Sequence, residues 1–444
     1  MSSNTLSVFG LGKLGSSMLV SFAHQGWNVI GVDINENIVE KINQGVSPIE
    51  EPLVQEYLTE NTDRISATVD VDYAVKSSFA SFIVVPTPSM SDGKFSTQYV
   101  QKALEDIATA LRSKEDYHLI VITSTVLPGD TARLARIVEE TSEKKLNVDF
   151  GLCYNPDFIA LGKVVHDFLY PDMVLIGQSD RRAGDILEGI HRILADSAPP
   201  IYKMSWENAE LAKISLNSYC TMKITFANVI GEICETMPGG DAEAVLRAIG
   251  SDARIGHKYF KPGLAWSGPC FPRDNSAFSR VARDYGVVNT LSETNDAINH
   301  YHRSVRILNY IKKFIRRNGA SKIAVLGLSY KEDTPVIEES VSIRVVKGLI
   351  GQGVEVTVYD PLAMDNAKKE LPERVIYADS MQSCIRGQTI CFVATPHPVF
   401  KTLSPTDIIH SMGVDPVILD AWNIFPASIE GVSVKKIGKN YAKS

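Results

Sequence analysis

Short apolar runs alternate with helix-length amphipathic segments along the first two hundred residues. The runs at 6–10, 27–33, 81–88 and 119–126 are rich in β-branched residues and have the length of buried strands. Strands buried on both faces and joined by crossover helices give this alternation. We therefore predict one doubly wound α/β domain of the Rossmann type over residues 1–200.

A different pattern begins at Ser205, where more than thirty residues run with one glycine and no proline. Ser205 is a good helix N-cap, and the Pro-Gly-Gly at 238–240 is a good stop. Helical pattern continues to about Asn318, interrupted by the Gly/Pro-rich stretch 261–274, which we interpret as a loop. We predict a central helical domain over residues 201–318, with one helix long enough to bridge two domains.

A second α/β rhythm follows the central helices. Apolar runs recur at 322–328, 354–360, 389–396 and 417–422, again separated by helical segments. We predict a second mostly parallel sheet, and hence a Rossmann-like α/β domain, over residues 319–444.

Composition and charge narrow the class of protein. Lys and Arg total 45 against 52 Asp and Glu, and the net charge of −7 has the wrong sign for binding phosphate backbones. The N-terminus lacks a basic segment followed by an apolar one, and no stretch approaches the ~20 apolar residues that span a bilayer. We expect a cytoplasmic protein whose partners include neither a membrane nor a nucleic acid. Six cysteines without a CxxC pair predict free thiols and no metal site.

The first strand runs into a glycine-rich loop. Gly10 permits a tight turn, Gly12 lets backbone approach a pyrophosphate, and Gly15 lets helix and strand pack closely. Asp33 ends the second strand, where a carboxylate accepts hydrogen bonds from a ribose and repels a 2′-phosphate. The combination predicts a site for NAD in preference to NADP.

Two further groups of residues could carry chemistry. Cys270 lies in the Gly/Pro-rich stretch close to Asp274, so it is either a nucleophilic thiol or a small buried apolar residue. Lys213 and Asn217 are four residues apart on the long helix and share a face. Together they could hold an oxyanion, or they could be a solvated lysine and a hydrogen bond between helices.

These residues belong to a longer series of motifs. In chain order the series is GLGKLG with Asp33, PIEEP (48–52), PTP (86–88), STVLPG (124–129), NPDF (155–158), AELAKISLN (209–217), RIGHKYFKPGLAWSGPCFPRD (254–274) and GLSYKEDT (327–334). The series resembles the landmarks of the UDP-glucose/GDP-mannose 6-dehydrogenase family over nearly the whole chain.

The resemblance implies an NAD-dependent, four-electron oxidation of a nucleotide sugar at its C6 alcohol, with UDP-glucose as the expected substrate. Cys270 would form a thiohemiacetal and then a thioester, and water would release the uronate. Lys213 and Asn217 would stabilise oxyanions, and Thr125 would lie near the reacting carbon. Asp274 would activate the water, with Asp157 as the alternative.

The resemblance also implies binding residues and an assembly. The expected cofactor contacts are Gly10, Leu11, Gly12, Leu14, Gly15, Asp33, Thr87, Thr125 and Arg273, with Glu51 close by. The expected substrate contacts are Lys213, Asn217, Arg254, Tyr259, Lys261, Gly263, Leu264, Gly268, Tyr330 and Lys331. Arg254 matches a residue that reaches a neighbouring subunit. We expect a homodimer or higher homo-oligomer through the long helix, whose apolar residues lie on more than one face.

The chain departs from the family pattern at four places. Leu161 replaces a glutamate proposed as an acid/base for thioester hydrolysis, and Arg273 replaces a lysine. Residues 335–338 lack the usual acidic pair and arginine, and residues 419–423 lack an arginine that grips the nucleotide.

Three alternatives stay open. One is a different nucleotide sugar, such as GDP-mannose or a UDP-N-acetylhexosamine. Another is a two-electron hydroxyacid-type dehydrogenase, which needs neither Cys270 nor a second sheet. The third is a non-catalytic NAD-binding protein, which Leu161 favours and Cys270 disfavours.

Overall fold

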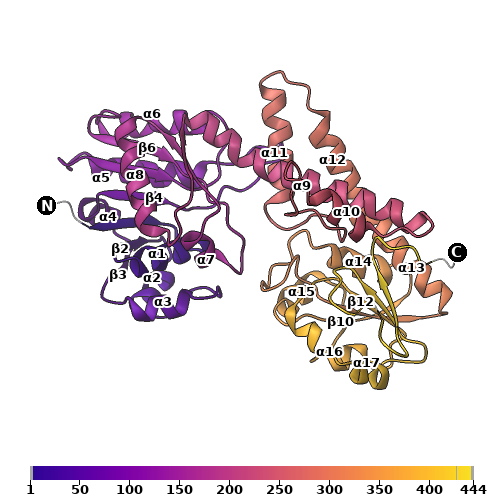
Figure 1. Ribbon diagram of the computed structural model, residues 1–444. Helices are drawn as coiled ribbons and strands as arrows, with labels where there is room; N and C mark the ends of the chain where they lie inside the picture. The colour runs from indigo at the N-terminus through magenta and orange to yellow at the C-terminus, as the bar shows by residue number, and fades with distance from the viewer. Residues whose placement is uncertain (1–3, 427, 442–444) are drawn as a thin grey trace. The chain divides into compact units, whose positions relative to one another are not determined.

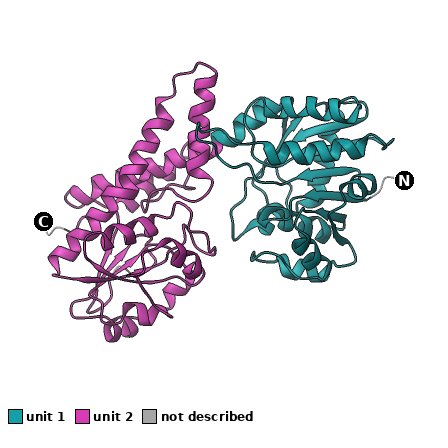
Figure 2. Ribbon diagram, turned by 180° about the vertical axis from the view of Figure 1, so that it is seen from behind, with its two compact units in different colours: residues 1–215 teal, residues 216–444 magenta. Residues whose placement is uncertain are grey.

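The computed structural model describes residues 4–426 and 428–441 and divides the chain into two compact units, Met1–Ser215 and Leu216–Ser444 (Figure 2). The division falls within the long helix α9 (Trp206–Thr236). The predicted three-way division at residues 200 and 318 is finer than these two units and stays a prediction.

The first unit is built on an eight-stranded sheet with the order β3-β2-β1-β4-β5-β6-β7-β8. Neighbouring strands are parallel except for the pair β6 and β7, which is antiparallel. The strands are β1 (Thr5–Phe9), β2 (Asn28–Val32), β3 (Ile65–Thr68), β4 (Ala80–Ile83), β5 (His118–Ile122), β6 (Phe150–Tyr154), β7 (Val174–Gln178) and β8 (Ile201–Met204).

Helices cover both faces of this sheet, because side chains alternate between the faces along each strand. Leu119 and Val121 of β5 pack into one apolar cluster, whereas Ile120 and Ile122 pack into the other. The helices are α1 (Lys13–His24), α2 (Glu36–Asn43), α3 (Val54–Glu60), α4 (Val71–Ser77), α5 (Gln98–Leu111), α6 (Asp130–Ser142), α7 (Val164–Leu169) and α8 (Arg181–Leu194). Helices α1, α7 and α8, which are labelled in Figure 1, bury residues in the first cluster, and α5 and α6 bury residues in the second.

The predicted strands form, but two are shorter than expected. The strand expected over 81–88 ends at Ile83, and the one expected over 119–126 ends at Ile122. Beyond them the Ser124 hydroxyl accepts from the Val85 amide at 2.9 Å and donates to the Val85 carbonyl at 2.7 Å. This side chain ties the two loops that follow the strands, so residues after them are placed at one edge of the sheet.

Helix α9 confirms the predicted long helix. The Ser205 hydroxyl accepts from the Asn208 amide at 3.4 Å at its start, and the helix ends just before the Pro-Gly-Gly. Four large apolar side chains recur every seven or eight residues and are exposed, namely Leu211, Tyr219, Phe226 and Ile233. Self-association through this stripe stays a prediction.

The second unit carries a six-stranded, fully parallel sheet with the order β11-β10-β9-β12-β13-β14. The strands are β9 (Lys322–Leu326), β10 (Glu355–Tyr359), β11 (Ile376–Tyr377), β12 (Ile390–Val393), β13 (Val417–Asp420) and β14 (Ser433–Lys436). The helices are α10 (Ala242–Gly250), α11 (Phe271–Asp284), α12 (Thr290–Tyr301), a π-helical turn (His302–Arg306), α13 (Ile307–Arg317), α14 (Val341–Ile350), α15 (Met364–Glu370), α16 (Met381–Ile385), a 3-10 turn (Pro398–Thr402) and α17 (Pro405–Ser411). Two sheet domains with a long helix between them in the sequence confirm the predicted fold class.

The Gly/Pro-rich stretch is only partly a loop. Helix α11 begins at Phe271, with Cys270 as its N-cap and Pro272 in its first turn. Proline is tolerated there because the first amides of a helix lack an intrahelical acceptor. The expectation of a loop over 261–274 is therefore wrong for its last four residues, and Asp274 belongs to a helix.

Candidate functional site

The glycine-rich loop has the geometry expected from its sequence. Gly10 has a φ of +90°, and a Cβ there would lie 2.7 Å from the Val84 carbonyl oxygen. A Cβ on Gly15 would lie 1.7 Å from the Gly10 carbonyl oxygen. Side chains at these two positions are excluded by the turn and by the close approach of helix α1.

Gly12 differs from its neighbours because the space beside it is open. Among the described residues, no atom lies within 4 Å of the place that its Cβ would take. Gly12 is also the N-cap of α1, so the free amides of the first turn, to which Leu14 belongs, face a site that an anion can approach. The residues present therefore fit a dinucleotide pyrophosphate.

Asp33 lies beside this loop, directly after β2. Its Oδ2 accepts from the Leu11 amide at 2.7 Å, and its Oδ1 accepts from the Asn35 amide at 2.9 Å. The two bonds fix the carboxylate at the carboxyl edge of the parallel strands, where dinucleotides bind in such sheets. Thr87 and Thr125 follow β4 and β5 at the same edge; Thr87 is buried and Thr125 half-buried.

Glu210 connects the start of α9 to the segment that carries Thr125. Its carboxylate is fully buried and accepts from the Gly129 and Thr131 amides, each at 2.8 Å, at the start of α6. Burial raises the pKa of Glu210. Glu210 was not predicted from the sequence, although a glutamate three positions before Lys213 lies on the same side of the helix.

Lys213 contacts the segment that follows β6. Its buried ammonium donates to the backbone carbonyl of Asp157 and lies 4.7 Å from the centre of the Phe158 ring. The Asp157 Oδ2 is buried and has no hydrogen-bond partner among the described residues. Burial raises the pKa of Asp157 to about 7, with the charge of Lys213 opposing the rise. Asp157 can therefore gain or lose a proton near neutral pH.

Asn155 holds this segment in place. Its amide donates to the Leu175 carbonyl at 2.9 Å, and its Oδ1 lies 2.7 Å from the His191 Nε2. Burial lowers the pKa of His191 to about 4, so at neutral pH the uncharged ring donates its Nε2 proton to Asn155. Glu51 contacts the start of α7, where its carboxylate accepts from the Val164 amide at 3.1 Å.

Leu161 packs as an apolar side chain against the core of the first unit. A hydrocarbon cannot move a proton, so this position takes no part in acid–base chemistry. The neighbouring Asp157 is the titratable group that the same segment supplies.

Cys270 is the exposed member of six free cysteines; the other five, Cys153, Cys220, Cys234, Cys384 and Cys391, are buried. As the N-cap of α11, Cys270 has its sulfur at the positive end of a helix, which stabilises a thiolate. The interpretation of Cys270 as a small buried residue is therefore wrong.

Asp274 lies one turn into the same helix and is buried. The Asn217 side-chain amide donates to its Oδ2 at 2.6 Å, and the Arg273 Nε lies 3.5 Å from its Oδ1. A donor and a cation on its two oxygens hold this carboxylate as an acceptor of hydrogen bonds. Asn217 thus fixes the start of α11, and with it Cys270, to α9.

Buried polar residues of α9 hold the loop that precedes α11, and their roles were not predicted from the sequence. Asn228 on α9 accepts from the Gly263 amide at 3.0 Å and donates to the Leu264 carbonyl at 3.2 Å. Thr225 accepts from the Trp266 indole at 2.9 Å. Asn228 follows Asn217 by eleven residues, about three helical turns, so the two asparagines lie on the same side of α9. This spacing is the sequence signal from which a role for Asn228 could have been predicted.

The expected substrate residues of the second unit lie around this loop. Tyr259 has a φ of +60°, and its ring meets the Phe271 ring edge-on at 5.9 Å. A Cβ on Gly268 would lie 2.5 Å from the Tyr330 ring, so that ring rests on the Gly268 backbone.

Other candidates are more exposed. Lys261 is exposed, Lys331 is half-buried, and Arg254 pairs with Asp252 at 2.7 Å on the surface. A Cβ on Gly263 would lie 3.2 Å from the Trp422 ring, which occupies the segment that lacks the family's arginine.

The candidates therefore form two sets. One set belongs to the first unit and includes Gly12, Asp33, Asp157 and Lys213; the other includes Cys270 and its neighbours in the second unit. Neither set includes a group of three or more His, Cys, Asp or Glu side chains placed to hold a metal, in the part of the chain that the structure describes. In that part, every helix is too short or too polar to cross a bilayer.

Family models of known proteins match most of the chain. Three models of the UDP-glucose/GDP-mannose dehydrogenase family match in order, the NAD binding domain over residues 4–195, the central domain over 207–301 and the UDP binding domain over 324–427. These matches confirm the resemblance seen in the motifs.

Individual relatives agree. The UDP-glucose 6-dehydrogenase AglM of Haloferax volcanii is 34% identical over 405 residues, which cover 90% of this chain and 92% of that protein. The GDP-mannose 6-dehydrogenase of Pseudomonas aeruginosa is 34% identical over 367 residues, 80% of each chain. A solved UDP-glucose dehydrogenase from Pyrobaculum islandicum is similar with a TM-score of 0.86 at 32% identity, covering 98% of both chains. The chain therefore belongs to the UDP-glucose/GDP-mannose dehydrogenase family of NAD-dependent nucleotide-sugar dehydrogenases.

Proposed function

We propose that this chain oxidises the C6 alcohol of UDP-glucose to the carboxylate of UDP-glucuronate through a covalent intermediate on Cys270. The observation that carries the proposal is the exposed Cys270 at the start of α11, with Asn217 bonded to Asp274 at 2.6 Å behind it. A two-electron alcohol oxidation needs no such thiol. A non-catalytic protein has no need of this arrangement either.

The reaction balances as one alcohol, one water and two NAD⁺ giving one carboxylate, two NADH and three protons. When bound, NAD⁺ accepts a hydride from the sugar carbon in each oxidation. After the first oxidation the Cys270 thiolate adds to the aldehyde carbon, and the carbonyl oxygen takes a proton to complete the thiohemiacetal. Loss of a hydride and that proton leaves the thioester. Water then adds, the carbon–sulfur bond breaks, and the carboxylate and the thiolate are released.

Charge develops on the substrate oxygen when the thiolate adds and again when water adds. We assign its stabilisation to the Lys213 ammonium and the Asn217 amide, which are one turn apart on α9. Thr125 lies near the reacting carbon in this proposal.

Water activation requires a base whose pKa lies near the working pH. Asp157 meets this condition because burial raises its pKa to about 7. Asp274 is held as an acceptor by Asn217 and Arg273. We therefore assign the activation of the hydrolytic water to Asp157. Asp274 is assigned the role of orienting Asn217 and the start of α11.

The substrate assignment rests on the relatives. A UDP-glucose 6-dehydrogenase and a GDP-mannose 6-dehydrogenase share the same 34% sequence identity with this chain, but the match to the former covers more of the chain. The similar solved structure from Pyrobaculum islandicum is also a UDP-glucose dehydrogenase. We propose that the nucleotide sugar contacts Arg254, Tyr259, Lys261, Gly263, Leu264, Gly268, Tyr330 and Lys331.

A panel of UDP-glucose, GDP-mannose and UDP-N-acetylhexosamines tests the substrate assignment through NADH formation. We expect the highest kcat/KM with UDP-glucose, and a higher value with GDP-mannose would move the assignment to that sugar.

Replacing Asp33 is expected to change the choice of cofactor. Asp33→Ala removes the anion that accepts from a ribose and repels a 2′-phosphate, so the preference for NAD over NADP should fall by about tenfold or more. The ratio of kcat/KM for the two cofactors measures the change. Asp130→Ala on the same unit, a partly exposed carboxylate paired with Arg133, is the control and should leave the ratio unchanged. A wild-type preference for NADP would contradict the interpretation of this loop.

A further inference from the structure

The second unit contains a buried carboxylate at the place that corresponds to Asp33. Asp360 follows β10 as Asp33 follows β2, and its Oδ2 accepts from the Leu328 amide at 2.7 Å, as Asp33 does from the Leu11 amide. The preceding Gly327 has a φ of +95°, close to that of Gly10. The turn after the first strand is thus built the same way in both units.

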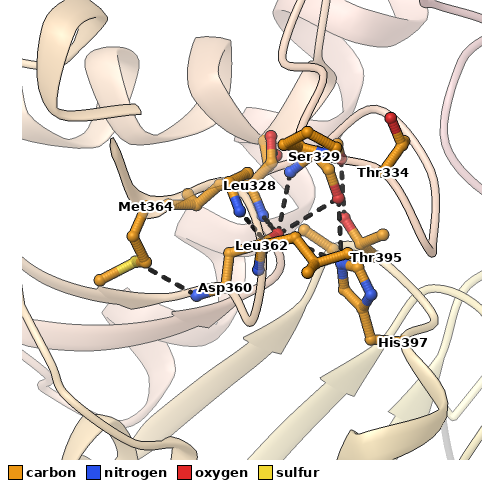
Figure 3. A network of polar contacts seen from close by, with 12 residues as sticks. Leu328, Ser329, Thr334, Asp360, Leu362, Met364, Thr395 and His397 are labelled. Atoms are coloured by element: carbon orange, nitrogen blue, oxygen red, sulfur yellow. Dashed lines mark hydrogen bonds and ion pairs between the residues drawn. The ribbon is translucent and has the colours of Figure 1, made fainter. Parts of the chain in front are cut away.

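Asp360 accepts hydrogen bonds at both of its carboxylate oxygens (Figure 3). The Leu362 and Ala363 amides donate to its Oδ1 at 2.8 and 2.7 Å. The Leu328 and Ser329 amides donate to its Oδ2 at 2.7 and 3.0 Å. Burial opposes its ionisation, but His397 and the hydrogen bonds from the Leu328 and Ser329 amides lower the pKa of Asp360 below its ordinary value. The charged form is the one that the fold holds.

His397 and Thr395 reach the same turn from the loop after β12 (Figure 3). The His397 Nε2 lies 3.2 Å from the Asp360 Oδ2 and 3.0 Å from the Ser329 hydroxyl. The Thr395 hydroxyl donates to the Ser329 carbonyl at 2.8 Å. All three side chains that hold Ser329 are at most 1% exposed. The amide, hydroxyl and carbonyl of Ser329 are therefore all fixed by buried groups.

The fixed residue stands directly before two proposed substrate contacts. Tyr330 and Lys331 follow Ser329, and the Tyr330 ring rests on the backbone of Gly268, two residues before Cys270. In the first unit the position equivalent to Ser329 is Gly12, which has open space beside it. In the second unit Ser329 is buried and bonded. The turn is thus a support for the residues after it.

We propose that Asp360, Thr395 and His397 are positioning residues that hold Ser329 so that Tyr330 and Lys331 meet the nucleotide of the substrate. This proposal rests on the proposed function, because it takes Tyr330 and Lys331 as nucleotide contacts. A displaced turn weakens binding in the ground state and the transition state alike. Such a loss raises KM and leaves kcat nearly unchanged.

A matched pair of variants separates positioning from stability. Thr395→Val removes a buried hydroxyl that holds Ser329, whereas Thr357→Val removes a buried hydroxyl of β10 that accepts from Gln388 at 3.1 Å. Both are the same substitution at buried sites of the same unit. We expect Thr395→Val to raise the KM for UDP-glucose about fivefold with kcat within twofold. Thr357→Val should leave the KM unchanged at a similar loss of thermal stability.

His397 supplies a second test with a rescue. His397→Leu should raise the KM about tenfold, because the Ser329 hydroxyl and Asp360 lose a partner. His397→Gln keeps an N–H donor of similar reach and should recover most of the loss. Equal KM values in the Thr395 and Thr357 variants, or no difference between the Leu and Gln variants, would overturn the positioning role.

The affinity for UDP alone, measured by titration calorimetry, keeps the two proposals distinguishable. If the wild-type chain oxidises no nucleotide sugar but binds UDP, and His397→Leu weakens that binding about tenfold, the proposed function fails and the positioning role stands. If the wild type oxidises UDP-glucose and His397→Leu leaves the KM and the UDP affinity unchanged, only the positioning role fails. If the wild type binds no UDP, both the proposed function and the positioning role fail.

Discussion

Cys270→Ser is expected to lower uronate formation by about a thousandfold or more, because the chemistry after the first hydride passes through this sulfur. A serine hydroxyl is a poor nucleophile without a base beside it. An oxygen ester, once formed, also releases the acid more slowly than a thioester. The rate of UDP-glucuronate formation measures the loss, and mass spectrometry of the variant after incubation with substrate would detect a trapped ester at residue 270.

Cys220→Ala is the control for the loss of a thiol. Cys220 is a buried cysteine of α9 with no assigned role, so its replacement should leave uronate formation within about twofold once the folded fraction is equal. If the Cys270→Ala variant formed uronate at the wild-type rate, the covalent mechanism would be contradicted. Loss of activity in both variants would point to stability rather than chemistry.

Asp157→Asn is expected to stop the cycle at the thioester. The first turnover forms two NADH per chain, after which an amide cannot take a proton from the attacking water. The steady-state rate should fall by about 10² to 10⁴-fold, while a rapid burst of NADH remains. Stopped-flow absorbance measures the burst, and mass spectrometry should show an acyl group on Cys270.

The pH dependence offers a second readout of the same residue. Because burial raises the pKa of Asp157 to about 7, the carboxylate is protonated at pH 5.5 and ionised at pH 8.5. A base works in its ionised form, so the wild-type rate of thioester hydrolysis should rise with pH and reach half its maximum near pH 7. This limb should be absent in Asp157→Asn.

Asp274→Asn is the comparison that separates the two carboxylates. Asp274 accepts from Asn217 and lies beside Arg273, so the variant should slow every step without accumulating the thioester. If NADH formation in Asp274→Asn showed a burst and then stalled, while Asp157→Asn turned over normally, the activation of the water would be assigned to Asp274 instead.

Eight strands of the two sheets could be predicted from the sequence because strands buried on both faces give continuous apolar runs, although the buried β6 and β7 were not predicted. Edge strands such as β3, β8 and β11 are half-exposed and short, so they leave no such run. The helix α9 could be predicted because nothing interrupts its thirty-one residues. Pro272 was misleading at α11, since a proline that stops a helix elsewhere is tolerated in the first turn.

The chemistry was predictable in part. The residue types at Gly10, Asp33 and Cys270 follow from local rules about turns, ribose contacts and thiols. The raised pKa of Asp157 does not, because it depends on burial by residues distant in the sequence. The same holds for Asp360 and His397, which are thirty-seven residues apart and meet only in the folded unit.

The ratio of NADH to uronate in the wild-type reaction tests the four-electron oxidation most directly. UDP-glucose is incubated with excess NAD⁺, NADH is followed by absorbance, and the sugar products are separated and quantified. We expect two NADH for each UDP-glucuronate, with no free aldehyde at any time, because the aldehyde carbon stays bound until hydrolysis. One NADH per product with release of the aldehyde, or no NADH from any nucleotide sugar, would contradict the four-electron oxidation.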